Sequence, residues 1–220
     1  MFTCPYCLSY NSYFRSPINS FSYIRILHAS PNAPAVDILI NNRPMFKDIP
    51  FKKFTNYINL PTGLYNIKIF ASGTTVNPIV NTDLFIPGGI IYTIAVTDNF
   101  PHIRLFPILD VRRPIVQGKT LIRFIHLSPN APNVDITLPN GVVLFRNIGY
   151  KEVTKYIPIE PGEYTLDLRI SGTGERILTV PGINLKSNRF YTVYAVGYAS
   201  KSPKLQALIP LDGNSYLQFI

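Results

Sequence analysis

Two copies of one short motif contain the residue types that a nucleophilic hydrolase uses. The residues are His28, Ser30 and Asp37, repeated as His126, Ser128 and Asp135. A serine activated by a histidine, with an acid behind the histidine, carries out acyl transfer. A histidine and a serine two positions apart on a strand share one face. However, Pro31 directly after Ser30 has no backbone N–H to offer an oxyanion hole.

A structural role explains the same residues better. The string Ser-Pro-Asn-Ala-Pro predicts an extended loop, because its two prolines fix φ and leave few backbone donors. A histidine and an aspartate at its two ends would brace such a loop. Two identical active sites in one chain are a weaker interpretation than a repeated requirement of the fold. We therefore expect a non-enzymatic protein without a catalytic site.

The spacing Cys4-Pro-Tyr-Cys7 is that of a redox pair or of half a zinc site. The redox chemistry needs a preceding strand and a following helix, yet only three residues precede Cys4. His102 has no counterpart in the second copy, and there is no second cysteine pair. We expect neither a metal site nor a cofactor. Because both cysteines of the chain lie here, we predict that they cross-link subunits.

The segment around these cysteines is rich in aromatic residues and nearly uncharged. We expect a flexible arm over residues 1–21 that docks on a neighbouring subunit or adds a strand to its sheet. The docking residues that we predict are Phe2, Tyr6, Tyr10, Tyr13 and Phe14. The alternative is a leader without a role. Since the segment lacks a basic start and a continuous apolar core, we expect production in the cytoplasm without a signal peptide.

The rest of the chain is a duplication. Residues 24–37 read IRILHASPNAPAVD and residues 122–135 read IRFIHLSPNAPNVD, 98 positions apart. Each copy also ends on an apolar, proline-containing run with an acid, at Asp110 and Asp212. This period is too long for a solenoid and indicates a duplicated domain. We predict β-sandwich 1 over 22–110, a linker over 111–119, β-sandwich 2 over 120–214, and a tail or last strand over 215–220.

Short alternating runs separated by Gly and Pro predict seven antiparallel strands in each copy. The predicted ranges are 23–29, 35–40, 54–60, 64–71, 79–86, 90–97 and 102–108, then 121–127, 134–138, 153–158, 163–170, 176–184, 189–196 and 204–210. This number of strands indicates an immunoglobulin-like sandwich, and hence an all-β protein. Because the linker is short and contains Pro and Gly, we expect two domains in a fixed or semi-fixed line.

The composition limits the partners. With 46% hydrophobic and only 15% charged residues, the chain folds around a sizeable core. The net charge of +9 is spread over scattered Lys and Arg residues, which argues against a nucleic-acid site and leaves an anionic cell-wall polymer as an alternative ligand. No stretch approaches the ~20 apolar residues of a membrane span.

The string H-x-S-P-N-A-P-x-V-D, followed by Y-x-x-x-x-G-x-Y and Y-T-x-x-A-V, resembles the domain-of-unknown-function family 4397. The resemblance covers roughly residues 22–110 and 120–212. It implies an immunoglobulin-like β-sandwich of the kind common in bacterial and archaeal surface proteins, and it implies no established activity. Members of this family often carry a secretion signal, and the chain departs from the family in that respect.

Three functions remain open from the sequence. The first is a structural protein that self-assembles through its arm into a homo-oligomer or homopolymer, alone or with other surface proteins. Such a protein, made without a signal peptide, suits a bacterial spore coat or spore surface appendage. The second is a binding module for a glycan or an anionic cell-wall polymer. The third is a hydrolase that uses the His/Ser/Asp motif.

Overall fold

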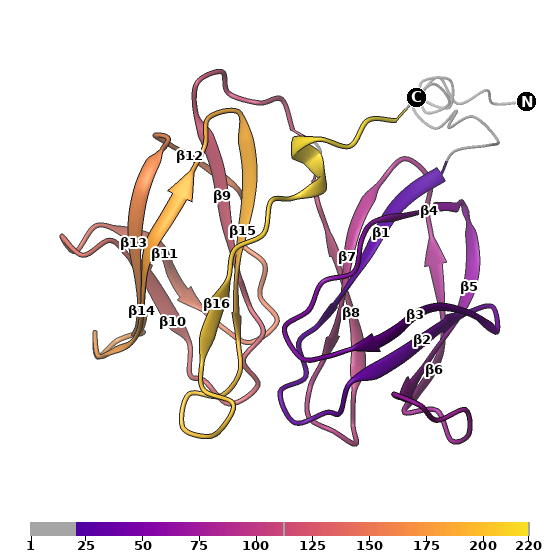
Figure 1. Cartoon of the computed structure of the whole chain (residues 1–220). Helices are drawn as coiled ribbons and strands as arrows, with labels where there is room; N and C mark the ends of the chain where they lie inside the picture. Colours follow the sequence, from indigo (N-terminus) through magenta and orange to yellow (C-terminus); the bar gives the residue numbers. More distant parts are fainter. Residues whose placement is uncertain (1–20, 112, 220) are drawn as a thin grey trace, which may run out of the picture.

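The computed structural model describes residues 21–111 and 113–219 and is all-β (Figure 1). Domain 1 contains eight strands: β1 (Phe21–His28), β2 (Val36–Ile40), β3 (Arg43–Ile49), β4 (Ile58–Pro61), β5 (Gly63–Ala71), β6 (Val80–Ile86), β7 (Ile91–Thr97) and β8 (Arg104–Leu109). Domain 2 contains the next eight: β9 (Thr120–His126), β10 (Val134–Thr137), β11 (Val143–Ile148), β12 (Ile157–Ile159), β13 (Gly162–Ile170), β14 (Arg176–Leu185), β15 (Arg189–Val196) and β16 (Gln206–Leu208). A single turn of 3-10 helix, η1 (Gly213–Ser215), follows β16.

Each domain is a sandwich of two four-stranded sheets with the same strand order. In domain 1 the sheets are β4-β1-β7-β8 and β3-β2-β5-β6. In domain 2 they are β12-β9-β15-β16 and β11-β10-β13-β14. The predicted pair of β-sandwiches is confirmed. One pair of neighbouring strands in each domain is parallel, β1 with β7 and β9 with β15, and the other pairs are antiparallel.

The burial of the strands shows which sheets lie inside the molecule. β2 alternates between buried and half-buried residues, as expected of a sheet with one wet face. All seven residues of β9 are buried, which requires cover on both of its faces. The core of its own sandwich covers one face, and domain 1 covers the other. The two domains therefore pack sheet against sheet, and the molecule has four layers of strands (Figure 1).

This packing differs from the line of two domains that the short linker suggested. The sheets β4-β1-β7-β8 and β12-β9-β15-β16 face each other, and we call the contact between them the domain interface; part of it is a shared apolar cluster. The cluster joins Leu27 and Ile108 of domain 1 to Ile125 and Tyr194 of domain 2. A short linker permits this arrangement because it lets the second copy fold back beside the first.

Each domain has one strand that the sequence did not predict. β3 in domain 1 and β11 in domain 2 lie at the edges of the outer sheets. β3 is mostly exposed, contains Pro44, and pairs with β2 through irregular register. β11 pairs with β10 in the same irregular way. Edge strands with bulges lose the alternation on which the prediction depends.

The C-terminal segment crosses from domain 2 to domain 1. The Tyr23 hydroxyl donates a hydrogen bond to the Gln218 carbonyl (2.8 Å), and the ring of Phe219 stacks on Phe21 at 5.7 Å between centroids. Of the two interpretations left open for residues 215–220, a last strand or a docking segment, the described part 215–219 contains no strand and contacts the other domain. Among the described residues, no helix is long and apolar enough to cross a bilayer.

Candidate functional site

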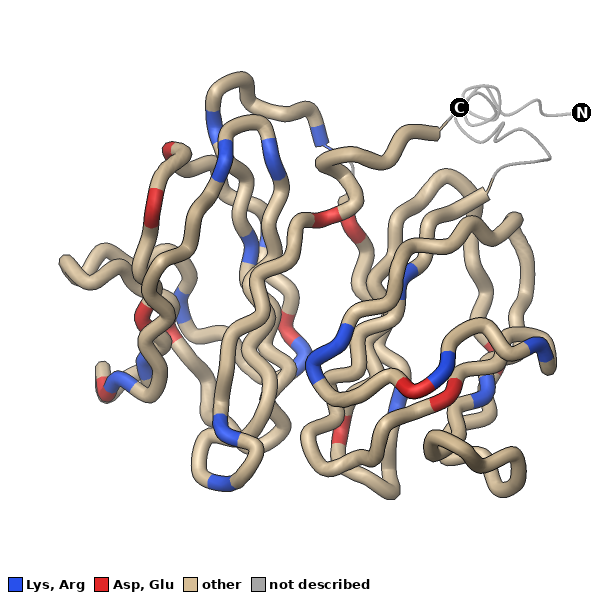
Figure 2. The backbone as a smooth tube through the Cα atoms, in the orientation of Figure 1, with Lys and Arg blue, Asp and Glu red and all other residues tan. Residues whose placement is uncertain are grey.

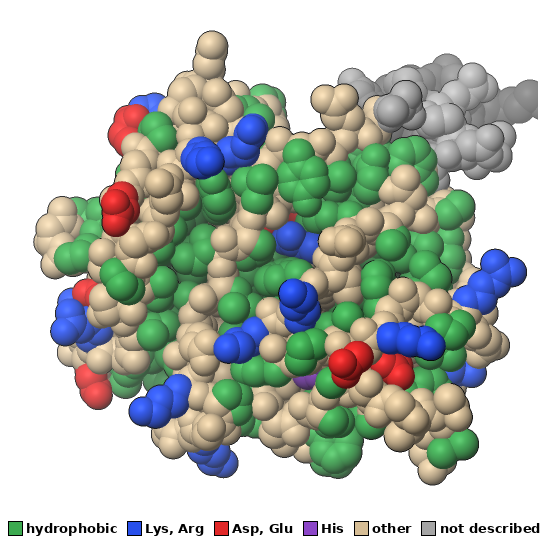
Figure 3. All heavy atoms as spheres, viewed as in Figure 1, with side chains coloured by type: hydrophobic (Ala, Val, Ile, Leu, Met, Phe, Trp, Pro, Cys, Tyr) green, Lys and Arg blue, Asp and Glu red, His purple; other side chains and the backbone are tan. Residues whose placement is uncertain are grey.

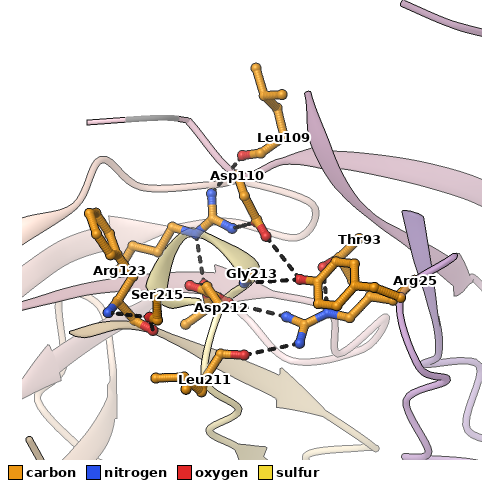
Figure 4. A network of polar contacts seen from close by, with 12 residues as sticks. Arg25, Thr93, Leu109, Asp110, Arg123, Leu211, Asp212, Gly213 and Ser215 are labelled. Atoms are coloured by element: carbon orange, nitrogen blue, oxygen red, sulfur yellow. Dashed lines mark hydrogen bonds and ion pairs between the residues drawn. The ribbon is translucent and has the colours of Figure 1, made fainter. Parts of the chain in front are cut away.

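The domain interface contains a buried network of charges, drawn in Figure 4. Arg25 on β1 extends out of domain 1 toward the end of domain 2. Its guanidinium donates to Thr93 Oγ1 (2.9 Å), to the Leu211 carbonyl (3.1 Å) and to Asp212 Oδ1 (3.1 Å). The last two acceptors belong to domain 2, so the side chain joins the two sandwiches.

The second copy makes the equivalent contacts in the opposite direction, from domain 2 to domain 1. Arg123 on β9 donates to Thr192 Oγ1 (2.8 Å) and to the Leu109 carbonyl (2.8 Å), and it pairs with the Asp110 carboxylate. Arg123 corresponds to Arg25 in the repeat, and Asp110 corresponds to Asp212. Each arginine therefore binds the aspartate at the end of the other domain. We call these contacts the reciprocal exchange.

Tyrosines complete the coordination of the two carboxylates. The Tyr57 hydroxyl donates to Asp110 Oδ2 (3.2 Å), and the Tyr156 hydroxyl donates to Asp212 Oδ2 (2.7 Å). The guanidinium of Arg25 lies over the ring of Tyr57 at 4.8 Å, and that of Arg123 lies over Tyr156 at 4.6 Å. These distances are typical of cation–π contacts, and the tyrosine rings shield the guanidinium charges from water.

The network is nearly dry. Arg25 is 4% exposed, Arg123 1%, Asp110 1% and Asp212 0%. Burial, with the nearby Asp212 charge, raises the pKa of Asp110 to about 6, although both arginines oppose the shift. Burial opposes the charged form of both arginines, but the surrounding tyrosines and carboxylates outweigh it and raise the pKa of Arg25 and Arg123. Each buried charge has its partner in this arrangement, and separating the two domains here would leave buried charges unpaired.

The apolar part of the domain interface is not symmetric. Tyr194 is fully buried there and packs edge-on against Phe54 at 5.5 Å between centroids. The corresponding residue of domain 1 is Ala95. Among the described residues the Tyr194 hydroxyl has no hydrogen-bond partner, which is a cost for a buried polar group. One large and one small residue at equivalent positions favour the pairing of unlike domains over the pairing of like ones.

The repeated motif lies at one end of the sandwiches. The ring of His28 donates from Nε2 to the Pro34 carbonyl (3.0 Å), on the tautomer that this acceptor requires. The Ser30 hydroxyl donates to the Asp98 carbonyl (2.6 Å). In domain 2, His126 contacts the Pro132 carbonyl (3.2 Å) and the Ser128 hydroxyl donates to the Gly197 carbonyl (2.7 Å). Burial lowers the pKa of both histidines, so they are neutral.

The aspartate of each motif faces a different loop. Asp37 accepts from the backbone N–H of Asp48 (2.8 Å) and of Gly73 (3.0 Å). Asp135 accepts from the backbone N–H of Asn147 (2.7 Å) and from the Ser171 hydroxyl (2.9 Å). Among the described residues, no hydrogen bond joins a motif serine hydroxyl to a histidine ring or a histidine ring to a motif aspartate. The described hydrogen bonds of the motif residues thus connect neighbouring loops, and they do not place a base beside either serine hydroxyl.

The residues predicted for assembly lie outside the described residues. They are Cys4, Cys7, Phe2, Tyr6, Tyr10, Tyr13 and Phe14. Within the part of the chain that the structure describes, no group of His, Cys, Asp and Glu residues is arranged to hold a metal ion. Lys and Arg residues are distributed over both domains (Figure 2) and form separate spots on the face shown in Figure 3.

Sequence reasoning missed the reciprocal exchange. Its signals were present: an arginine inside each apolar first strand, and an aspartate at the end of each last strand, at the same places in both copies. A charge repeated within a strand that is otherwise apolar is costly unless it is paired. The sequence alone does not indicate that the aspartate bound by each arginine lies in the other domain.

Two duplicated sandwiches joined by buried ion pairs define a tandem β-sandwich protein. The model of the domain of unknown function DUF4397 matches residues 22–137 and 138–219. The chain belongs to this family and contains the domain as a tandem repeat. The search of curated proteins gave no match.

Three solved structures with some similarity to this chain come from bacteria. The Bacillus anthracis TIE protein is 17% identical, with a TM-score of 0.28 over 86% of this chain, and the chain covers 34% of that protein. A carbohydrate-binding module of Eubacterium rectale Amy13K, solved with maltoheptaose, is 10% identical with a TM-score of 0.27, and 86% of this chain and 96% of that chain are covered. A putative cell adhesion protein of Bacteroides ovatus is 12% identical with a TM-score of 0.29, covering 88% and 96%.

Proposed function

We propose that this chain is a non-enzymatic structural protein that self-assembles through its N-terminal arm on a bacterial surface, specifically in a spore coat or spore surface appendage. The observation that carries the proposal is the reciprocal exchange, which makes one block of the two domains without any cysteine. Both cysteines lie in the arm and none in residues 21–219, so no disulfide is needed to hold the two domains together.

The place where the arm starts supports this function. The described chain begins at Phe21, whose ring contacts both Tyr23 and Phe219. The first described residue therefore lies beside the C-terminal segment. Twenty residues can span at most about 70 Å, which would be enough to reach a second copy of the block. We infer a homopolymer joined by arms, with other surface proteins as further partners.

The described site gives no support to the hydrolase alternative. A nucleophile needs its base within hydrogen-bond reach, whereas each motif serine donates to a backbone carbonyl of another loop. We therefore propose a role in the fold for the motif.

The test compares three proteins by light-scattering chromatography and negative-stain microscopy, with and without reductant. They are the full chain, a version that starts at Phe21, and the full chain with Cys4→Ser and Cys7→Ser. We expect oligomers or polymers only from proteins that have the arm. When the cysteines are reduced or replaced, these oligomers should dissociate on dilution. Identical monomers from all three proteins would contradict the proposal.

A further inference from the structure

The outer sheets of the two domains present equivalent faces to solvent, but with opposite chemistry. In domain 1 this face, which we call the outer face, is formed by the outward residues of β2, β5 and β6, the sheet at the right of Figure 1. Its apolar residues are Leu39, Leu64, Phe70 and Phe85, of which Phe70 is only 5% exposed and forms the floor of a depression. The strand pairing places Thr137, Glu163, Arg169 and Asn184 at the same positions of domain 2.

One end of the outer face is an exposed apolar pair. Leu64 on β5 and Phe85 on β6 lie directly opposite each other, and they are 64% and 58% exposed. Glu163 and Asn184 form the equivalent pair in domain 2. The sandwich therefore does not need apolar residues here. Two large apolar side chains held side by side in water indicate a binding role.

The other end is a pocket of about 330 Å³. Phe70, Leu39 and Pro44 give it apolar walls. Its polar lining consists of Thr74, Thr75 and one charged residue of each sign, Asp37 and Lys47. In domain 2, Arg169 occupies the position of Phe70. Its guanidinium donates to Thr137 Oγ1 (3.3 Å) and to the Gly174 carbonyl (3.1 Å) and pairs with Asp167 (3.0 Å).

Between the apolar pair and the pocket lies a row of ordered polar groups. The Asn66 amide donates to Asn81 Oδ1 (3.0 Å) and to Asp83 Oδ1 (2.8 Å). The Lys68 ammonium donates to Asn42 Oδ1 (2.8 Å). These bonds hold the side chains in place and leave further amide, ammonium and carboxylate sites for a ligand. The row contains one Lys and one Asp and has no net charge.

We propose that the outer face of domain 1 binds a neutral oligosaccharide, with one sugar in the Phe70 pocket. Each sugar ring has an apolar C–H face and a rim of hydroxyl groups. The outer face alternates in the same way: the apolar Leu64–Phe85 pair, the polar row around Asn66, then the pocket. From Leu64 to Phe70 the strand is about 20 Å long, which is more than one sugar ring.

Other ligands fit less well. A polyanion such as nucleic acid requires clustered positive charge, and Lys68 is balanced here by Asp83. A protein partner favours a contiguous apolar centre, whereas the centre of this face is its polar row. This site goes beyond the proposed assembly function and does not depend on the arm.

The test uses the full chain under reductant on a panel of immobilised neutral hexose and N-acetylhexosamine oligomers, with polyglycerol phosphate and single-stranded DNA as anionic probes. Hits are measured by titration calorimetry. Leu64→Glu with Phe85→Asn transfers the pair of domain 2 to domain 1. The triple variant Leu39→Thr, Lys68→Asp, Phe70→Arg transfers its arginine cluster and fills the pocket. The matched control is Val142→Asn, which removes an apolar side chain of similar exposure (50%) in domain 2.

We expect at least one neutral oligomer to bind. Either domain 1 variant should lose affinity about tenfold or more, and the control should lose none. A tenfold loss corresponds to only about 1.4 kcal/mol, which the removed apolar contact readily supplies. An unchanged melting temperature in the variants shows that the fold is intact. The proposal is overturned if no neutral oligomer binds, if only the anionic probes bind, or if the domain 1 variants bind like wild type. Since all variants retain the arm, their oligomeric state reports on assembly independently.

Discussion

Replacing Arg25 by methionine tests whether the reciprocal exchange holds the two domains together. The variant keeps a side chain of similar length but removes the donors to Thr93, to the Leu211 carbonyl and to Asp212. It leaves the fully buried Asp212 without its cation. Breaking a buried pair from one side costs about 3–5 kcal/mol.

For a chain of this size, 1 kcal/mol lowers the melting temperature by about 2–4 °C. We therefore expect Arg25→Met to lower it by about 6–20 °C. Thermal and urea unfolding, followed by far-UV circular dichroism and by tyrosine fluorescence, measure the change. Agreement of the two probes shows whether both domains still unfold together.

Arg169→Met is the matched control. Arg169 also binds a buried aspartate, Asp167, within domain 2, but the Arg169 side chain is 31% exposed. Without it, Asp167 would keep Arg176 at 3.7 Å and the Thr179 hydroxyl at 2.7 Å as partners. A partly exposed pair contributes about 1 kcal/mol or less. Adding Asp212→Leu to Arg25→Met removes the unpaired charge and is expected to restore part of the lost stability. A loss of under about 1 kcal/mol in Arg25→Met, equal to that in the control, would refute the reasoning.

Three further predictions concern the repeated motif. Gly197 has φ of +91°, and an added Cβ would clash with the Lys204 carbonyl oxygen. Gly197→Ala should therefore destabilise the protein by about 2 kcal/mol or more in urea unfolding, and a neutral result would contradict this reasoning. The histidines His28 and His126 have folded pKa values below the usual 6.5, so the unfolded chain takes up protons first as pH falls. Stability should therefore fall from pH 7 to pH 5, and a variant with both histidines changed to glutamine should lose less over that window; a larger loss would refute this. The pKa of Asp110 is raised to about 6, so this group stabilises the fold as pH falls. Its contribution is the same in wild type and in the histidine variant and cancels when the two are compared. Changing Ser30 and Ser128 to alanine should cost about 1–3 kcal/mol through two lost buried hydrogen bonds, and an esterase screen that finds activity dependent on either serine would contradict the structural role.

The fold could be predicted from the sequence because its signals are local and repeated. The runs around Ile24 and Ile122 match closely, and strands such as 64–71 alternate between inward and outward residues. Turn residues mark the ends of most strands. β3 and β11 were missed because an exposed edge strand with a bulge has no alternation to detect.

The domain interface was harder to predict because it depends on contacts between distant residues. Arg25 and Asp212 are 187 residues apart, and no local pattern assigns one to the other. The divergence of the outer faces also appears only after the strands are paired, since it compares Leu64 and Phe85 with residues that the register identifies. The local pattern therefore specifies each sandwich, whereas the placement of charges and apolar residues between sheets requires the structure.

The most direct test of the proposed function is the mass of the full-length protein in solution as its concentration rises under oxidising conditions. Multi-angle light scattering measures this mass, and the version starting at Phe21 provides the reference monomer. The proposal predicts a mass that grows with concentration for the full chain and stays at one copy for the reference. A full chain that stays at 24.8 kDa over the whole range would contradict assembly through the arm.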